Sequence, residues 1–216
     1  MSKQTSEHPK GNGQKISFPE RLLKQGLAHS SIKADVYDNV TVLSLRFTDP
    51  FALAEYVGGG DNATTALDHL ICHFEDFLEA RRIDYWKILS DQIVCAAGMQ
   101  DNSNHPVTAM AELALSFQDT CSHLFADLDK PMEFKIGMDT GGVIGSPVGR
   151  RRKSYNIWGE AVSTALMMAD NAVTGGIQVS ETTYWRLRQN YLFRVRGRYY
   201  LQNIGEISTY LLTGRI

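Results

Sequence analysis

Apolar side chains recur every three or four residues in two long stretches of the chain. Over residues 64–82 they fall on one helical face, and they are Leu67, Leu70, Ile71, Phe74, Phe77 and Leu78. Over residues 106–125 the same spacing runs through Met110, Ala114, Phe117, Cys121 and Leu124. A period of about 3.6 residues is that of an amphipathic helix. We therefore predict two long helices, each with one face against a core.

Shorter stretches rich in β-branched and apolar residues lie between and after these helices, and they predict strands. The predicted strands are 39–45, 83–89, 92–97, 133–138, 177–179, 192–196 and 207–212. Ser90-Asp91 joins the second and third of these strands, which predicts a hairpin.

Local signals add four shorter helices and one break. The helices are expected at 19–27, from Asp49-Pro50 onward, at 160–170, and from a cap at Ser180 through Arg188. The run GGGDN at 58–62 predicts a flexible break. Strands and helices alternate without separate blocks, which indicates one α/β or α+β domain.

The composition fits one globular domain, because 43% of the 216 residues are hydrophobic and 21% are charged. Residues 1–15 are polar and have almost nothing to bury, so we expect a disordered leader or linker there. Residues 16–216 are expected to form the domain. No stretch approaches the roughly 18 apolar residues of a membrane span, so we expect no membrane contact by this chain.

Charge and cysteine content narrow the class of partner and the compartment. The net charge of -2 gives no global attraction to nucleic acid, so no nucleic-acid partner is expected. Cys72, Cys95 and Cys121 lie far apart in the sequence and form no CxxC pair. They are expected to be small core residues in a reducing, cytoplasmic setting, either alone or as the cytosolic part of a larger membrane-attached protein.

Five segments, taken in order, resemble the class III adenylate and guanylate cyclase catalytic domain. They are YDNVTVLSLRFTDPF at 37–51, WKILSDQIVCAAG at 86–98, FKIGMDTGGVIGSPVGRRRKSYNIWGEAVSTALMM at 134–168, GIQVSETTYWRL at 176–187 and STYLL at 208–212. The resemblance implies an α+β class III nucleotidyl cyclase fold, with a ferredoxin-like central sheet flanked by helices. It also implies a head-to-tail dimer with shared active sites, here through the faces around 141–149 and the 160–170 helix.

Cyclases of this family hold two divalent ions with two aspartates, and the resemblance places these at two positions of this chain. One position is Asp91, and the other is Arg46. At an effective dielectric constant of about 20, unit charges about 4 Å apart interact by about 4 kcal/mol, so an arginine there opposes a metal ion. Asp49 is interpreted as a helix cap. If any metal binds, we expect Mg²⁺ or Mn²⁺ at Asp91.

The residues that read the base in this family fall at Lys87 and Asn156. A lysine four residues before the hairpin aspartate is the adenine type, while the partner aspartate has become an asparagine that offers both a donor and an acceptor. This predicts a nucleotide site for a ligand such as ATP. The alternative, a solvated strand residue and a turn residue, stays equally open.

The positions that stabilise the transition state in this family are substituted. By alignment they are Ser163, where the family has asparagine, and Met167, where it has an arginine that neutralises phosphate. Methionine cannot donate to phosphate. The C-terminal segment LQNIGEIS at 201–208 also lacks the family's lysine. With Arg46, these changes leave no intact catalytic set.

Three further candidates receive structural interpretations. The basic run at 150–153 is expected to be a solvated face, and the glycines at 141, 142, 145 and 149 are expected to make tight turns. His69 and His73 share a helix face without an evident third ligand, so a surface pair is expected rather than a metal site.

Three functions follow from this pattern. The favoured one is a catalytically deficient domain that acts as a dimerising regulatory module in cyclic-nucleotide signalling, as a homodimer or as a heterodimer with an active cyclase domain. The first alternative is an unorthodox adenylate cyclase with Asp91 as its only aspartate ligand. The second is a nucleotide-binding sensor in which Arg46 holds phosphate directly.

Overall fold

The computed structural model describes residues 34–47, 54–55, 57–89, 91–100, 105–126, 133–149, 151–201 and 205–216. Residues 34–216 form one compact unit. The predicted leader at 1–15, the predicted helix at 19–27 and the predicted cap at Asp49-Pro50 lie outside the described residues.

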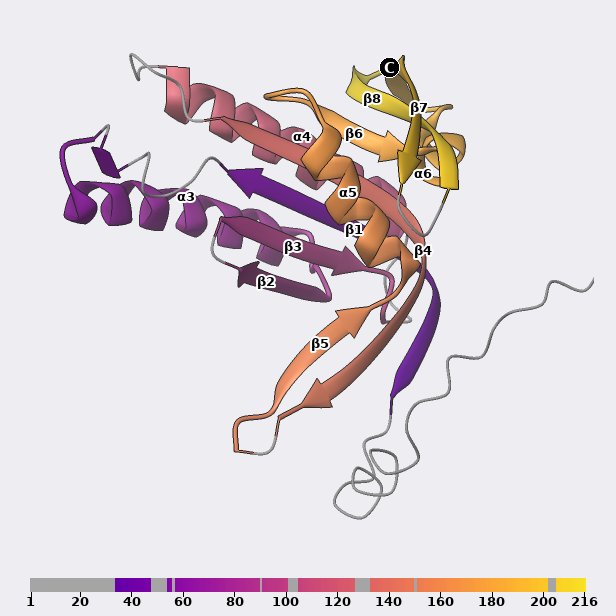
Figure 1. Ribbon diagram of the computed structural model, residues 1–216, viewed down its shortest axis with the longest axis horizontal. Coiled ribbons are helices and arrows are strands. Elements are labelled where there is room, and N and C mark those ends of the chain that lie inside the picture. Colours follow the sequence, from indigo (N-terminus) through magenta and orange to yellow (C-terminus); the bar gives the residue numbers. More distant parts are fainter. Residues whose placement is uncertain are drawn as a thin grey trace, which may run out of the picture. The chain divides into compact units, whose positions relative to one another are not determined.

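A single eight-stranded sheet organises this unit (Figure 1). Its strands are β1 (Asp35–Phe47), β2 (Tyr85–Leu89), β3 (Gln92–Ala97), β4 (Phe134–Val148), β5 (Ser154–Trp158), β6 (Ile177–Ser180), β7 (Tyr191–Leu201) and β8 (Gly205–Arg215). They run in the order β2-β3-β1-β4-β6-β8-β7, and β5 pairs with the far half of β4. The β4–β6 pairing is parallel and the other pairings are antiparallel.

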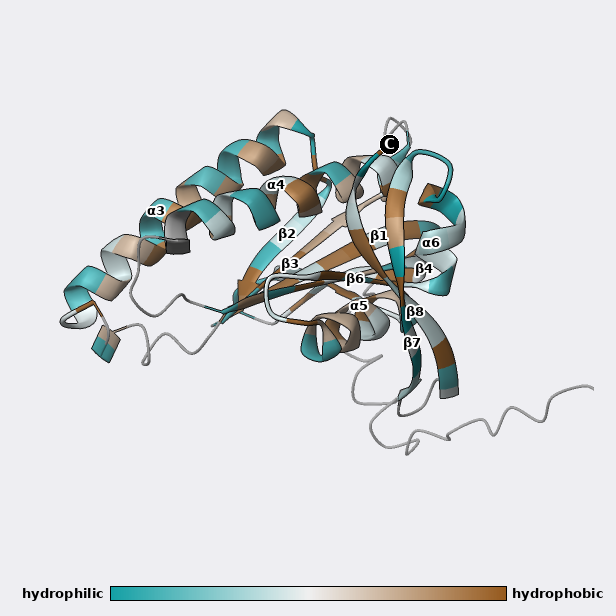
Figure 2. Cartoon of the chain, turned by 90° about the horizontal axis from the view of Figure 1, so that it is seen from above, coloured by the Kyte–Doolittle hydropathy of each residue, from teal (hydrophilic) through white to brown (hydrophobic). Residues whose placement is uncertain are grey.

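Helices cover both faces of the sheet (Figure 2). On one face, α3 (Gly60–Ala80), α4 (Pro106–Ala126) and α6 (Glu181–Leu187) bury a core that includes Phe74, Phe117 and Leu43. On the other face, α5 (Glu160–Asn171) buries Ala161 and Ala165 against Val42 and other strand residues. None of the helices in the described residues is both long and apolar enough to span a bilayer.

The main sequence predictions for the elements are confirmed. Both long amphipathic helices, the 85–97 hairpin and the helix over 160–170 form where the patterns place them. Ser180 caps α6, because its side-chain oxygen accepts a 3.3 Å hydrogen bond from the backbone N–H of Thr183.

Three predictions are wrong. The break at 58–62 is shorter, because α3 begins at Gly60 after two glycines with positive φ, Gly58 and Gly59. Cys72 is exposed rather than in the core, whereas Cys95 and Cys121 are buried. The third wrong prediction is that the glycines at 141, 142 and 145 make tight turns.

The glycine-rich run is a strand and not a series of turns. Gly141, Gly142 and Gly145 all lie within β4, and of the four glycines only Gly149, with φ +113, follows the end of that strand. Gly137 explains part of this pattern, since a Cβ there would lie 2.1 Å from the backbone nitrogen of Ala169. The missing side chain lets α5 approach the sheet closely enough to bury its alanines.

Candidate active site

The two residues expected to read a base meet across 69 positions of sequence. Lys87 on β2 donates through Nζ to Oδ1 of Asn156 on β5, with 2.6 Å between the atoms. The same Nζ lies 3.1 Å from Oγ of Ser154, which is two residues earlier on β5. Figure 1 shows β5 folding back beside β2, which makes these contacts possible. Both side chains are half-buried, and Asn156 lies within β5 rather than in a turn.

A cavity of about 520 Å³ opens beside this pair. Its lining residues come from β2, β3, β5 and α5, and they are Tyr85, Lys87, Leu89, Gln92, Val94, Asn156, Ile157, Trp158, Gly159, Val162, Ser163 and Leu166. Its volume and mostly apolar walls, with a few polar groups, are typical of small-molecule sites. Three of the predicted positions, Lys87, Asn156 and Ser163, therefore share one cavity. Met167 lies one turn further along α5 and is half-buried.

Arg46 is held between two carboxylates. Its Nε lies 3.3 Å from Oδ2 of Asp91, and its Nη1 donates to Oδ1 of Asp170 on α5. The hydrogen bond to Asp170 is the largest influence that raises the pKa of Arg46 above its ordinary value, so the side chain stays charged. About 40% of the Arg46 side chain is exposed, so each of its two ion pairs contributes little to stability, roughly 0–1 kcal/mol. Arg46 is important for its charge, because its guanidinium is a fixed cation between the carboxylates of Asp91 and Asp170.

Asp170 is the one residue of this cluster that sequence reasoning missed. It lies seven residues after Ser163 and three after Met167, so all three share one face of α5. This spacing on one helix face is the signal by which the sequence could have indicated Asp170. A second hollow of about 380 Å³ is lined by Arg46, Phe47, Glu133, Lys135 and Asp170. Lys135 adds a further positive charge there, with Nζ 3.4 Å from the backbone oxygen of Asp170.

The donor set does not fit a pair of divalent ions. Only Asp91 remains of the two expected aspartates, and it faces a guanidinium. Among the described residues, no three His, Cys, Asp or Glu side chains gather as metal ligands. His69 and His73 are both exposed on α3. A metal ion at Asp91 requires that Arg46 first move away.

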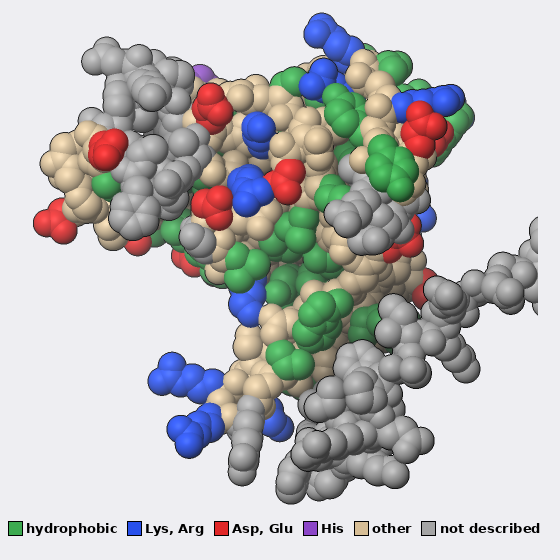
Figure 3. Space-filling model, viewed as in Figure 1, with side chains coloured by type: hydrophobic (Ala, Val, Ile, Leu, Met, Phe, Trp, Pro, Cys, Tyr) green, Lys and Arg blue, Asp and Glu red, His purple; other side chains and the backbone are tan. Residues whose placement is uncertain are grey.

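Charged side chains are distributed unevenly over the face that carries α5. Figure 3 shows basic and acidic groups interspersed at its centre and a purely basic group at the tip of the β4–β5 arm. Arg151, Arg152 and Lys153 are exposed there, in agreement with the predicted solvated face.

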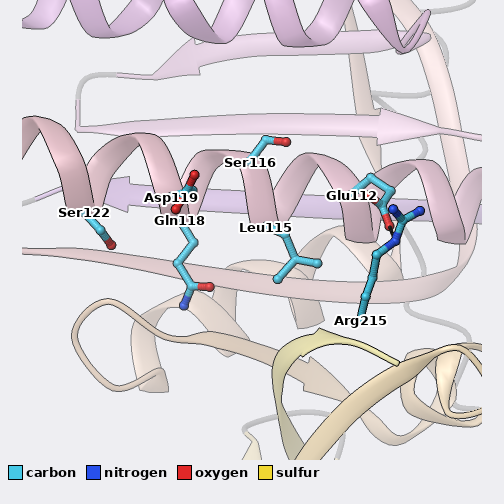
Figure 4. A pocket seen from close by; sticks show the side chains of 7 residues that line it. All are labelled: Glu112, Leu115, Ser116, Gln118, Asp119, Ser122 and Arg215. Carbon is cyan, nitrogen blue, oxygen red and sulfur yellow. Dashed lines mark ion pairs between the residues drawn. The ribbon is translucent and has the colours of Figure 1, made fainter.

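A third hollow, of about 470 Å³, lies between α4 and the end of β8 (Figure 4). Arg215 forms an ion pair with Glu112, with 2.8 Å between Nε and Oε1. The hydroxyl of Tyr191 donates to the same carboxylate at 2.5 Å. Burial, reinforced by Glu112, raises the pKa of Tyr191 to about 12. These contacts fasten the C-terminal strand to α4, away from the Lys87 cavity.

The chain belongs to the adenylate and guanylate cyclase catalytic domain family, whose profile matches residues 32–214. It is 28% identical to an adenylate cyclase of Mycobacterium tuberculosis over 209 residues, which is 96% of this chain and 44% of that protein. It is 23% identical to the membrane guanylyl cyclase of Dictyostelium discoideum over 194 residues, 90% of this chain and 13% of that one. The chain thus spans less than half the length of these curated relatives.

Solved structures agree on the fold. The guanylate cyclase domain of RhGC from Catenaria anguillulae, solved in complex with GTP, superposes with a TM-score of 0.77 at 17% identity, covering 84% of this chain and all of that one. The adenylyl cyclase CyaB from P. aeruginosa gives a TM-score of 0.75 at 18% identity, covering 84% and 96%. The predicted class III cyclase fold is therefore confirmed.

Proposed function

We propose that this chain is a catalytically deficient cyclase domain that acts as a dimerising regulatory module in cyclic-nucleotide signalling. The observation that carries the proposal is the position of Arg46, which forms ion pairs with Asp91 and Asp170 at the position where the resemblance implies a metal-binding aspartate. Asp91 is then paired with a guanidinium instead of with a divalent ion, and the guanidinium itself contacts carboxylates instead of a nucleotide.

The residues on α5 support the same proposal. Ser163 lies at the cavity but offers only a hydroxyl, and Met167 offers no hydrogen-bond donor to a phosphate. Loss of charge neutralisation in phosphoryl transfer typically lowers the rate by about three to five orders of magnitude. Arg46, Ser163 and Met167 affect different parts of the transition state, so any one restoration leaves the others deficient.

A product assay tests the deficiency directly. The purified chain is incubated with ATP or GTP and with Mg²⁺ or Mn²⁺, and cyclic nucleotide is measured beside an active cyclase domain as positive control. We expect product formation no faster than background. Turnover that disappears in Asp91→Ala would instead establish the unorthodox adenylate cyclase.

A dimer is part of this proposal, and the surface that supports it keeps the 141–149 part of the expected one, through Ile144, but not the alanines of the 160–170 helix. Ala161, Ala165 and Ala169 are fully buried within the unit, so they are not available to a partner. Val36, Ile144 and Trp158 instead form an apolar stripe across β1, β4 and β5, since Ile144 is paired with both of the others. They are 69%, 44% and 45% exposed. Exposed apolar patches of this kind are typical of protein–protein contacts.

Light scattering on the purified chain tests the dimer. We expect a homodimer at high micromolar concentration, or a heterodimer when an active cyclase domain is added, and we expect Trp158→Asp to shift the equilibrium to monomer. A monomer at every concentration, alone and with the active domain, contradicts the dimerising role. A monomer would not bear on the catalytic deficiency, which the product assay tests separately.

The contacts of Arg46 bear on the alternative of a nucleotide-binding sensor. Arg46 already has two carboxylate partners, so binding phosphate would cost both contacts. This weighs against Arg46 as a residue that binds phosphate.

The buried free thiols of Cys95 and Cys121 fit a reducing cytoplasm, where the domain acts alone or as the cytosolic part of a larger membrane-attached protein.

A further inference from the structure

The elements α6, β7 and β8 lie together at one edge of the sheet and carry a charge opposite to that of the whole chain (Figure 1). Residues 185–216 hold six arginines, no lysine and one acidic side chain, Glu206, although the chain has a net charge of -2. All six arginines are exposed. They create a local positive potential that the net charge conceals.

The strand register places an apolar and a basic side chain of β7 on the face of the sheet that carries α6. Val195 is paired with Tyr210 of β8. Arg198 is paired with Ser208, which lies two positions from Tyr210 and therefore on the same side of the sheet. The ring of Tyr210 stacks on that of Tyr184 in α6, with 3.8 Å between the ring centroids, which identifies this side as the one under α6.

A bulge is the reason that Val195 and Arg198 share this side. Three positions apart on an unbroken strand, the two residues would point to opposite faces. The pairing of β7 with β8 shifts between Val195 and Gly197, and the extra residue turns Arg198 to the side of Val195.

Two side chains of α6 continue this surface. The guanidinium carbon of Arg188 lies 4.2 Å from the ring centroid of Trp185, so the ring and the cation pack as one unit. Trp185 is 53% exposed and Val195 is 75% exposed, so both offer apolar area to a partner. Trp185, Arg188, Val195 and Arg198 together are called the α6 surface below.

The two arginines of the α6 surface keep their charge free for an external anion. Glu181 accepts a 3.5 Å hydrogen bond from Nε1 of Trp185, and Glu206 is paired with Tyr200 further along the hairpin. Within the described part of the chain, however, no carboxylate forms an ion pair with Arg188 or Arg198.

The apolar side chains decide which anionic partner fits. A single-stranded nucleic acid stacks its bases on open aromatic faces, whereas Arg188 covers one face of Trp185. An exposed valine adds nothing to such stacking. An anionic bilayer uses every part of the α6 surface, because tryptophan favours the membrane interface, apolar side chains enter the boundary between headgroups and acyl chains, and guanidinium groups bind lipid phosphates.

We propose that the α6 surface attaches this domain reversibly to membranes that contain anionic phospholipids. A peripheral contact of this kind lies on the bilayer and needs no spanning segment. Each arginine near an anionic membrane strengthens binding by about fivefold, and salt weakens that contribution. None of the four residues lines the cavity beside Lys87, so the inference does not depend on the proposed function.

Co-sedimentation with two kinds of vesicle tests the proposal. One kind contains phosphatidylcholine alone, and the other contains equal parts of phosphatidylcholine and phosphatidylserine. We expect the purified chain to sediment with the anionic vesicles, to stay in solution with the neutral ones, and to be released by added NaCl. Failure to sediment with anionic vesicles overturns the proposal, and so does equal sedimentation with both kinds. Binding to soluble poly-glutamate without binding to vesicles would also overturn it, in favour of an acidic protein partner.

A pair of double variants with the same change of net charge locates the contact. We expect Arg188→Gln with Arg198→Gln to weaken binding to the anionic vesicles at least about tenfold. The matched control is Arg151→Gln with Arg152→Gln at the exposed tip of the β4–β5 arm, which we expect to keep the affinity within about twofold.

Val195→Ser tests the apolar part, and we expect it to weaken binding without changing the dependence on NaCl. An equal loss in the two double variants would show that binding follows net charge instead of the α6 surface, and would overturn the proposal. All substituted side chains are exposed, so the variants are expected to fold as the unmodified chain does.

Discussion

Arg46 on β1 donates a hydrogen bond to Asp170 on α5, 124 residues later in the chain. The same guanidinium pairs with Asp91 beside the hairpin. One arginine therefore connects β1 to α5 and to the β2–β3 hairpin, and it supplies the positive charge between two carboxylates. Its removal should affect metal affinity more than stability, because the pairs are partly exposed.

Arg46→Ala should create a divalent cation site. Without the guanidinium, Asp91 and Asp170 offer oxygen ligands to Mn²⁺ and lose the repulsion from a fixed positive charge. We expect Mn²⁺ affinity, measured by calorimetry, to rise at least about tenfold over the unmodified chain. Arg46→Lys is the control, because it keeps a cation and should not bind Mn²⁺ better. Equal Mn²⁺ binding by Arg46→Ala and by Arg46→Ala with Asp170→Asn would exclude Asp170 as a ligand.

Cyclisation should return only when three positions are changed together. Arg46→Asp adds an oxygen ligand beside Asp91, while Ser163→Asn with Met167→Arg restores groups for ribose and phosphate. Because these groups act on one transition state, their effects should be strongly non-additive. We expect product from ATP or GTP, followed by chromatography, only in the triple variant. A folded, metal-binding triple variant without activity points instead to the missing lysine in the 201–208 segment.

Gly137→Ala should strongly destabilise the fold. The new Cβ would meet the backbone nitrogen of Ala169 at 2.1 Å and the backbone oxygen of Ala165 at 2.2 Å, so α5 would have to move from the sheet. We expect a loss of at least about 3 kcal/mol in urea unfolding. Gly141→Ala is the matched control on the same strand, since its Cβ meets Ala161 at an ordinary 3.5 Å. Similar stabilities for the two variants would show that close packing of α5 at Gly137 is not what the fold requires.

Stability should fall in alkaline solution because of Tyr191. Burial and Glu112 raise its pKa in the folded protein from 10.0 to about 12, so the unfolded chain releases this proton first. The contribution of Tyr191 is complete below pH 10 and is lost as the pH rises to about 12. We expect the unmodified protein to lose on the order of 2 kcal/mol relative to Tyr191→Phe over that interval, measured by chemical denaturation at each pH. Parallel curves for the two proteins would contradict the role of this hydroxyl.

Local sequence signals determined the elements that depend on neighbouring residues. Apolar spacing predicted α3 and α4, because a helix buries residues only three or four positions apart. The hairpin at Ser90-Asp91 and the cap at Ser180 also depend on a few adjacent residues. The ordered motifs from residue 37 to 212 indicated the family, which the profile match over 32–214 confirms.

The tertiary structure decided what depends on contacts between distant segments. Gly141, Gly142 and Gly145 were predicted to make turns, but pairing with β1 and β5 extends β4 to Val148. Lys87 finds Asn156 and Ser154, and Arg46 finds Asp170, only because the sheet and α5 bring them together across 67 to 124 residues. The sequence by itself indicated, through its resemblance to the family, which catalytic positions are expected to be substituted. The partners of Arg46 and Asn156 follow from hydrogen-bond geometry that exists only in the folded chain.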